Sequence, residues 1–251
     1  MSTIFFDSDE TLYAEKMAKV KAEVDVALFI SESSKIDFHK VHAVFLGSKN
    51  KIMALNPTDP NRNNRVLWYQ DMLRELNLAG PDPEMLGDKY WGIVLSEIKP
   101  YPDLMVVLPE LSKQYSLWVL TDELLDIQRR KIDKLGLSGF FKGIISSVDA
   151  GHAKPHPELF EYAIRKAETS KDDVVMIGDN PQRDIKGANR SGIVSIFFRR
   201  GKFYYYPLEG DEKPSYILSD YTKLPEILSL IDRDRVTLSP SSGRFESKSL
   251  G

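Results

Sequence analysis

The sequence predicts an α/β fold with a doubly wound, mostly parallel sheet and an inserted α-helical domain. Three observations support this prediction. Several short apolar runs end in polar residues, helical patterns separate the later runs, and a long helical segment separates the first two. Runs rich in Ile, Val and Phe that are apolar on both faces are typical of buried parallel strands. Their alternation with helices is typical of a doubly wound sheet.

Five apolar runs are the predicted strands. They are TIFFD at residues 3–7, SLWVLTD at 116–122, KGIISS at 142–147, VVMIGD at 174–179 and GIVSIFF at 192–198. Helical patterns follow at residues 122–137, after Pro155, and before the last run. Functional groups in such sheets gather just beyond the carboxyl ends of the strands. The polar residues that end these runs are therefore the candidate site.

The segment between the first two strands is too long for one crossover helix, which takes roughly a dozen residues. Apolar residues recur at helical spacing in three parts of it, residues 13–30, 38–47 and 65–77. Residues 56–64 have the Pro, Asn and Asp content of a loop. This segment is therefore predicted to be an inserted helical domain.

The predicted domain boundaries follow from this insertion. Residues 1–12 and 100–232 would form the α/β catalytic core, and residues 13–99 the helical insertion, with a return hinge around Pro100 and Pro102. The polar, Ser- and Gly-rich residues 233–251 are expected to form a flexible C-terminal tail. Packing of a Tyr-rich loop is expected at residues 203–206.

Composition excludes several classes of protein. The chain has 251 residues and no cysteine, which rules out disulfides, thiolate catalysis and Cys-based metal sites. A net charge of -3 gives no reason to expect nucleic-acid or membrane binding. There is no visible secretory signal, and the apolar stretches are too short to span a bilayer. We expect a cytoplasmic protein; the sequence leaves its oligomeric state open.

Two carboxylates follow the first predicted strand. Asp7 and Asp9 point the same way because side chains alternate along an extended backbone. Two like charges about 4 Å apart cost on the order of 4 kcal/mol at an effective dielectric of about 20. A cation between them, or a proton kept on one of them, would offset this repulsion. One carboxylate could attack phosphorus, the other could protonate the leaving oxygen, and Mg²⁺ could bind both. Capping of a turn is the structural alternative.

Other strand ends add matching groups. Asp179 and Asp184 could complete an all-oxygen Mg²⁺ site. The Thr121 hydroxyl, with the amides of the following helix, could hold phosphate oxygens. Lys154 could offset the negative charge of phosphate and carboxylates. The structural alternatives are an N-cap for Thr121, a favourable helix N-terminal charge for Asp184 and a solvated surface position for Lys154.

In this order, the motifs resemble the four motifs of the haloacid dehalogenase superfamily. They are Asp7-x-Asp9-x-Thr11, Thr121, Lys154-Pro155, and Gly178-Asp179 with Asp184. The resemblance spans the presumed core, and the inserted helical segment resembles the type-1 cap of that family. The family fold is a Rossmann-like α/β core, which agrees with the fold predicted above.

The resemblance implies a role for each matching residue. Asp7 would be the nucleophile and a Mg²⁺ ligand. Asp9 would be the general acid/base, with its backbone carbonyl on the metal. Thr121 would bind the phosphoryl group, and Lys154 would position and neutralise it.

The remaining implied roles concern the cofactor, Mg²⁺. Asp179 would be a metal ligand, and Asp184 would support the metal shell. Two positions depart from the family's commonest pattern. Glu10 stands where Gly is frequent, and Asp122, beside the predicted phosphate site, stands where Asn is usual. The added charge of Asp122 could weaken anion binding or alter substrate preference, or it could face away.

The predicted function is Mg²⁺-dependent hydrolysis of a small phosphate monoester through an aspartyl-phosphate. Dehalogenating members of the family usually lack the second Asp, so Asp9 favours phosphoryl transfer. The substrate would be a phosphorylated metabolite of sugar-phosphate, phosphoglycolate or glyceraldehyde-phosphate type. Arg62 or Arg65, from the basic part of the cap, is expected to touch it. The alternatives are a 2-haloacid dehalogenase, a phosphomutase, and a non-catalytic phospho-receiver or binding protein.

Overall fold

A six-stranded sheet forms the centre of the computed structural model, which describes residues 2–55, 58–200 and 208–238. All neighbouring strands are parallel, in the order β3-β2-β1-β4-β5-β6. The strands are β1 (Thr3–Phe6), β2 (Ser116–Thr121), β3 (Gly143–Ser146), β4 (Val174–Gly178), β5 (Val194–Phe198) and β6 (Tyr216–Leu218). The predicted doubly wound α/β fold is confirmed. The strand order reverses at β1, and ligands of such sheets bind where the order reverses.

The central strands are buried on both faces, which explains their unbroken apolar sequences. Alternate residues enter two separate hydrophobic clusters. In β1, Ile4 and Phe6 belong to one cluster, whereas Phe5 belongs to the other. In β4, Ile177 joins the first cluster and Met176 the second. These side chains are inaccessible to solvent, so the sheet is the rigid layer on which the strand ends are held.

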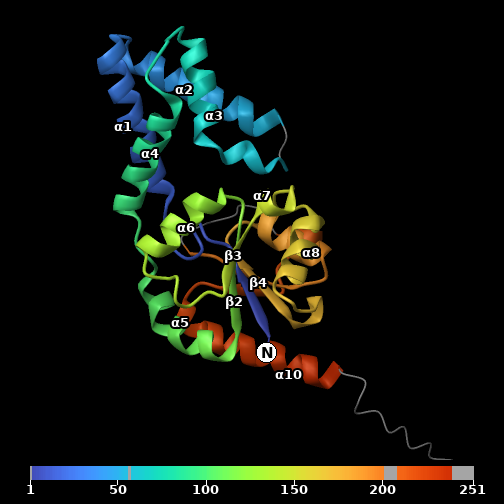
Figure 1. Ribbon diagram of the computed structural model, residues 1–251. Helices are drawn as coiled ribbons and strands as arrows, with labels where there is room; N and C mark the ends of the chain where they lie inside the picture. The colour runs from blue at the N-terminus through green and yellow to red at the C-terminus, as the bar shows by residue number, and fades with distance from the viewer. Residues whose placement is uncertain (1, 56–57, 201–207, 239–251) are drawn as a thin grey trace, which may run out of the picture.

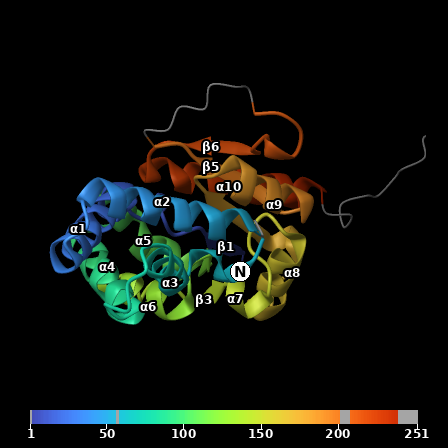
Figure 2. The same cartoon turned by 90° about the horizontal axis from the view of Figure 1, so that it is seen from above.

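Helices cover both faces of the sheet (Figures 1 and 2). The cluster on one face includes side chains of α5 (Pro102–Gln114), α6 (Leu125–Lys134) and α10 (Leu224–Leu238). The cluster on the other face includes side chains of α8 (Pro157–Lys166) and α9 (Lys186–Arg190). The remaining short helical elements are α7 (Ser147–Ala150), η1 (Pro60–Asn63), η2 (Lys171–Asp173), η3 (Pro181–Ile185), η4 (Gly210–Glu212) and η5 (Tyr221–Lys223).

In the part of the chain that the structure describes, five α-helices lie between β1 and β2, and the first four of them gather at one end of the sheet (Figure 1). They are α1 (Lys16–Ser34), α2 (Phe38–Leu55), α3 (Arg65–Glu75) and α4 (Pro83–Glu97). We call this group the cap. Aromatic side chains fill its interior: the rings of Phe45 and Tyr69 stack at 5.4 Å between centroids, and Tyr90 meets Trp91 edge-on at 5.0 Å.

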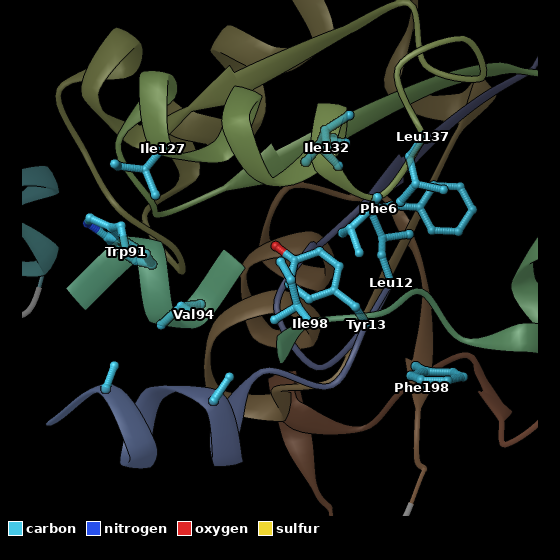
Figure 3. Close-up of a cluster of buried hydrophobic side chains, with 14 of the residues drawn as sticks. Phe6, Leu12, Tyr13, Trp91, Val94, Ile98, Ile127, Ile132, Leu137 and Phe198 are labelled. Carbon is cyan, nitrogen blue, oxygen red and sulfur yellow. The ribbon is translucent and has the colours of Figure 1, made fainter. Parts of the chain in front are cut away.

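The two connections between cap and core lie side by side. Tyr13 on the outgoing segment forms an isolated backbone bridge with Pro100 on the returning one, and the Tyr101 amide donates to the Leu12 carbonyl at 3.0 Å. Nearby, Trp91 and Val94 of α4 belong to the same apolar cluster as Ile127 of α6 (Figure 3). The cap therefore returns to the core next to the point where it left.

Some elements differ from the expectations. The helices α4 and α5 and the short edge strand β6 were not individually predicted. Helix α10 continues to Leu238, so residues 233–238 are helical. The prediction that a flexible tail begins at residue 233 therefore places its start too early. The end of α10 is fixed to the sheet because Arg235 donates to the Val174 carbonyl at 2.9 Å. Residues 203–206 and 239–251 lie outside the described residues. Among the described residues, no helix has both the length and the apolar character needed to span a bilayer.

Substitution of Gly187 by Ala should destabilise the protein by about 1–3 kcal/mol, because overpacking of a filled core costs energy of this size. An added Cβ would lie 2.2 Å from Cε2 of the buried Phe160 ring and 3.2 Å from the Pro155 Cα. Urea denaturation of Gly187→Ala measures the cost. The matched control is Gly47→Ala in α2, where no atom lies within 4 Å. It should be neutral or stabilising by about 0.5–1 kcal/mol; equal effects at both positions would contradict the packing argument.

Candidate active site

Strand ends bring the predicted site residues into one cavity. Asp7 follows β1, Thr121 ends β2 and Asp179 follows β4, and these three strands are neighbours in the sheet. Lys154 and Asp184 come from the segments after β3 and β4. All five line a cavity of about 310 Å³ between the sheet and the cap. Segments far apart in the sequence therefore meet at the point where the strand order reverses.

Asp7 is held by a buried lysine. Lys154 Nζ lies 2.5 Å from Asp7 Oδ1 and 2.7 Å from Asp184 Oδ1. The Thr11 hydroxyl donates to Asp7 Oδ2 at 3.2 Å. Burial raises the pKa of Asp7 to about 6, although Lys154 acts in the opposite direction. Burial by itself would lower the pKa of Lys154, but the Asp184 and Asp7 carboxylates outweigh it and raise that pKa above its usual value.

Three of the carboxylates could share a cation. Oxygen atoms of Asp7, Asp179 and Asp184 all lie within 4.8 Å of one another, and all three side chains are buried. Lys154 lies beside two of them, Asp7 and Asp184. Carboxylate oxygens are the ligands that Mg²⁺ prefers. The donor set therefore fits a divalent cation of this kind.

Backbone geometry fixes Asp184 in this cluster. It lies in η3, and its Oδ2 accepts a hydrogen bond from the Asn180 amide at 2.9 Å. Gly178 has no side chain to obstruct it: a Cβ at that position would lie 2.4 Å from the Asp184 Cβ. The Gly-Asp pair at the end of β4 thus allows a second acid to approach the strand end closely.

Asp9 has its own set of partners. Its carboxylate accepts hydrogen bonds from Lys19 at 2.8 Å, Lys131 at 3.1 Å and the Tyr13 hydroxyl at 2.7 Å. Burial would raise the pKa of Asp9, but Lys131 and Lys19 together hold it well below the ordinary value. The repulsion expected between Asp7 and Asp9 is thus offset by separate ammonium groups, with Lys154 serving Asp7.

Thr121 is the last residue of β2 and precedes the turn that leads to α6, which begins at Leu125. Its hydroxyl accepts a hydrogen bond from the Glu123 amide at 3.1 Å and lies 3.2 Å from the Ser8 hydroxyl. Gln128 Oε1 is within hydrogen-bonding distance of both hydroxyls. Thr121 therefore stabilises the turn and does not cap the helix directly.

The two departures from the family pattern have structural explanations. The Asp122 carboxylate accepts from the Lys154 amide at 2.9 Å and pairs with the Arg183 guanidinium, which neutralises its charge. Glu10 has a φ of 61°, a left-handed conformation that favours glycine. Its Oε1 accepts from the amides of Glu15 and Lys16, at the start of α1. Glu10 thus stabilises the start of α1, the first helix of the cap.

The two cap arginines lie in different surroundings. Arg65 lines the cavity but is only 4% exposed: it pairs with Glu123 of the core at 3.2 Å, and its guanidinium lies 4.5 Å from the centre of the Trp68 ring. Arg62 lines a separate cavity of about 350 Å³ on the cap, and its carbonyl accepts from the Trp68 indole. Contact of either arginine with substrate remains a prediction.

A comparison of the chain with known families decides its classification. The family described as haloacid dehalogenase-like hydrolase matches residues 4–198, which is most of the chain. The chain belongs to this family.

Curated relatives within the haloacid dehalogenase-like family are named as phosphatases. Glyceraldehyde 3-phosphate phosphatase of Methanocaldococcus jannaschii is 28% identical over 92% of the chain and 98% of its own length. Ribulose-1,5-bisphosphate 5-phosphatase of Halopiger xanaduensis is 26% identical over 78% of the chain and 84% of its own length. The prediction that the protein is a hydrolase of this family is confirmed, and the relatives named here are phosphatases.

Solved structures show the same fold. A 2-haloacid dehalogenase from Pseudomonas syringae pv. Tomato DC3000 superimposes with a TM-score of 0.72 and 23% identity, over 92% of the chain and 99% of its own length. At this identity the likeness supports the family fold alone. The reaction must be argued from the site residues.

Sequence reasoning missed several residues of this site: Ser8, Glu15, Lys19, Gln128, Lys131 and Arg183. Lys131 is the clearest case because it is fully buried and contacts both Asp9 and Glu15, at the cap–core boundary. It follows Ile127 by four residues, which places it on the buried face of α6. A lysine on an apolar helix face was the available signal.

Substitution of Gly178 by Ala should displace Asp184 and weaken the binding of Mg²⁺. We expect activity on p-nitrophenyl phosphate to need at least about tenfold more Mg²⁺, a change of about 1.4 kcal/mol. A Mg²⁺ titration of activity and of binding heat measures the shift. An unchanged Mg²⁺ requirement in folded Gly178→Ala protein would contradict a role for Asp184 near the metal.

Replacement of Lys131 by Met should lower kcat on p-nitrophenyl phosphate by at least about tenfold, because Asp9 and Glu15 lose a shared buried ammonium. The exposed neighbour Arg130, which pairs with Asp88 at 3.6 Å, gives the matched control Arg130→Met. That control should keep kcat within about twofold. Circular dichroism confirms folding of both variants. Equal kcat in Lys131→Met and the wild-type enzyme would exclude a positioning role for Lys131.

Proposed function

We propose that the protein is a Mg²⁺-dependent phosphatase that hydrolyses a small phosphate monoester through an aspartyl-phosphate on Asp7. The observation that carries this proposal is the buried arrangement of Asp7, Lys154, Asp179 and Asp184 at one strand-end cavity. It combines a nucleophile, a cation for phosphate oxygens and a set of hard oxygen ligands. Phosphoryl transfer depends chiefly on positioning and on such electrostatic stabilisation.

The covalent steps use the side chains of this site. An Asp7 carboxylate oxygen attacks phosphorus, and the bond from phosphorus to the leaving oxygen breaks. Asp9 gives a proton to that leaving oxygen and later accepts one from water, which requires that the negative charge of the bound phosphate raise the Asp9 pKa from the low value set by Lys131 and Lys19. The water oxygen bonds to phosphorus, and the bond from phosphorus to the Asp7 oxygen breaks. Inorganic phosphate leaves, and Asp7 is restored.

The cofactor and the phosphate would be held by neighbouring groups. Asp7, Asp179 and the Asp9 carbonyl would bind Mg²⁺, with Asp184 supporting that shell; the bound ion would reduce the repulsion between carboxylate and phosphate and stabilise the transition-state charge. The Lys154 ammonium and the Thr121 hydroxyl would hold phosphoryl oxygens. The Asp122 carboxylate would position Lys154 by accepting a hydrogen bond from the Lys154 backbone amide.

The proposed substrate is a small phosphorylated metabolite of sugar-phosphate type. The names of the relatives support this class, since they refer to glyceraldehyde 3-phosphate and ribulose-1,5-bisphosphate. Phosphoglycolate belongs to the same proposal. Arg65, which lines the cap side of the cavity, and Arg62, in the neighbouring turn η1, are the cap residues proposed to contact the substrate. A cytoplasmic location, where such metabolites occur, is part of the proposal.

The replacement Asp7→Asn should lower Mg²⁺-dependent hydrolysis of p-nitrophenyl phosphate by about a thousandfold or more, because the nucleophile is lost. The exposed Asp172→Asn is the control and should retain wild-type activity. The Asp9→Asn variant should accumulate phosphorylated enzyme. Release of p-nitrophenolate needs little general-acid catalysis, whereas the attack of water on the aspartyl-phosphate needs a general base. Acid quenching and mass spectrometry detect the phosphate on Asp7.

Each alternative reaction has a different result in the same assays. Survival of Mg²⁺-dependent turnover in Asp7→Asn rules out the proposed mechanism. Metal-independent chloride release from 2-chloropropionate would instead identify a dehalogenase. Phosphoryl return to a second position of a sugar would identify a mutase. Stoichiometric self-phosphorylation without turnover would identify a phospho-receiver, and binding without any reaction would identify a binding protein.

A further inference from the structure

The active-site cavity extends from the catalytic residues to the inner wall of the cap. Its cap side is lined by Lys19 and Glu23 of α1, Lys49 of α2, and Arg65, Trp68 and Tyr90. The catalytic groups at the opposite end are suited to one phosphoryl group. The remaining part of a substrate would therefore face these cap side chains, and their chemistry selects it.

The charge of the cap wall is positive. Three of its lining residues are cations and Glu23 is its acid, which leaves a net charge of two on this side. Two of the cations are committed to acids outside the cap helices. Lys19 bonds Asp9 at 2.8 Å and Glu15 at 2.5 Å, and Arg65 pairs with Glu123. These two cations hold the cap against the core.

Lys49 differs from the other two cations because its partner belongs to the cap. Its Nζ donates to Glu23 Oε1 at 2.5 Å and lies 5.5 Å from the centre of the Trp68 ring. An ammonium has three N–H donors. Among the described residues Lys49 uses one of them, for Glu23, so two remain for a ligand. A quarter of the Lys49 side chain is exposed, against 9% for Glu23.

This ion pair lies on the cap wall of the active-site cavity, whereas the groups proposed to bind the scissile phosphate belong to the core. A second cavity of about 320 Å³ runs along α1 and is lined by Lys49 and Glu23 as well as Asp9 and Glu10. Lys49 and Glu23 thus border both cavities. The ion pair with Glu23 holds the Lys49 ammonium on the cap wall. Without Glu23, this ammonium would be attracted toward the acidic groups of the core.

We propose that Lys49 determines substrate specificity by binding a second anionic group of the substrate, a carboxylate or a second phosphate. This inference rests on the proposed phosphatase function and narrows its substrate to sugar phosphates or phosphorylated sugar acids with a distal anion. Trp68 and Glu23 orient the ammonium, and its two unused donors bind the anion. A distal hydroxyl carries no charge, so it would accept hydrogen bonds from the ammonium without the additional ion-pair attraction that a carboxylate or phosphate gains.

Two matched pairs of probes test this proposal with the full-length enzyme and Mg²⁺. The carboxylate pair is 3-phosphoglycerate and glycerol 3-phosphate, and the phosphate pair is ribulose 1,5-bisphosphate and ribulose 5-phosphate. The wild-type enzyme should prefer the distal anion in at least one pair by about tenfold or more in kcat/KM. The pair that shows the preference identifies the anion.

The variant Lys49→Met should abolish that preference, mainly through KM, and should leave p-nitrophenyl phosphate hydrolysis within about twofold. Lys49→Arg keeps the charge and should retain the preference. Lys51→Met is the matched control: Lys51 lies on the same helix, pairs with Asp71 at 3.0 Å and does not line the active-site cavity. It should behave as the wild-type enzyme does.

Two results would overturn the inference. One is a wild-type enzyme that hydrolyses p-nitrophenyl phosphate but discriminates in neither pair. The other is a Lys49→Met variant that retains the preference or loses activity equally on both members of a pair. Failure of the proposed function is a different result, since the wild-type enzyme would then hydrolyse none of the probes, including p-nitrophenyl phosphate.

Discussion

The site depends on the balance between clustered carboxylates and buried cations at the ends of adjacent parallel strands. Burying acids is costly unless they are paired and hydrogen-bonded. Here Lys154 bridges Asp7 and Asp184, and Lys19 and Lys131 neutralise Asp9. The two acids that follow β1 are thus kept in different electrostatic environments. The pKa of Asp7 is raised and that of Asp9 is lowered, which is opposite to what a nucleophile and a general acid need, so a bound divalent cation and phosphate would have to reverse the difference.

The same ion pairs connect catalysis to the cap. Lys19 belongs to α1 of the cap, Lys131 to α6 of the core, and both contact Asp9 and Glu15. Arg65 and Glu123 form a second link between the two parts. The cap therefore does more than cover the cavity, because its first helix supplies one of the cations that hold Asp9.

The sequence predicted the fold because strands buried on both faces have an unmistakable composition, as in β1 and β4. It also predicted the side chains at the strand ends, since parallel strands bring their carboxyl ends together. It could not predict Lys131, whose role depends on how α6 packs against the cap, or the pairing of Asp122 with Arg183 across two loops. The end of α10 was missed because the Arg235 bond to Val174 is a tertiary contact.

The paired crossing at Tyr13 and Pro100 has a mechanical consequence. Because the two connections between cap and core lie side by side, they define one hinge axis about which the cap could rotate relative to the core. Substrate entry and phosphate release could then proceed by rotation about that axis, and the hydrogen bonds of the sheet would stay intact throughout. In such a rotation, the hydrogen bond from the Ala153 amide of the core to the Thr58 carbonyl of the cap, 2.8 Å long, would have to break.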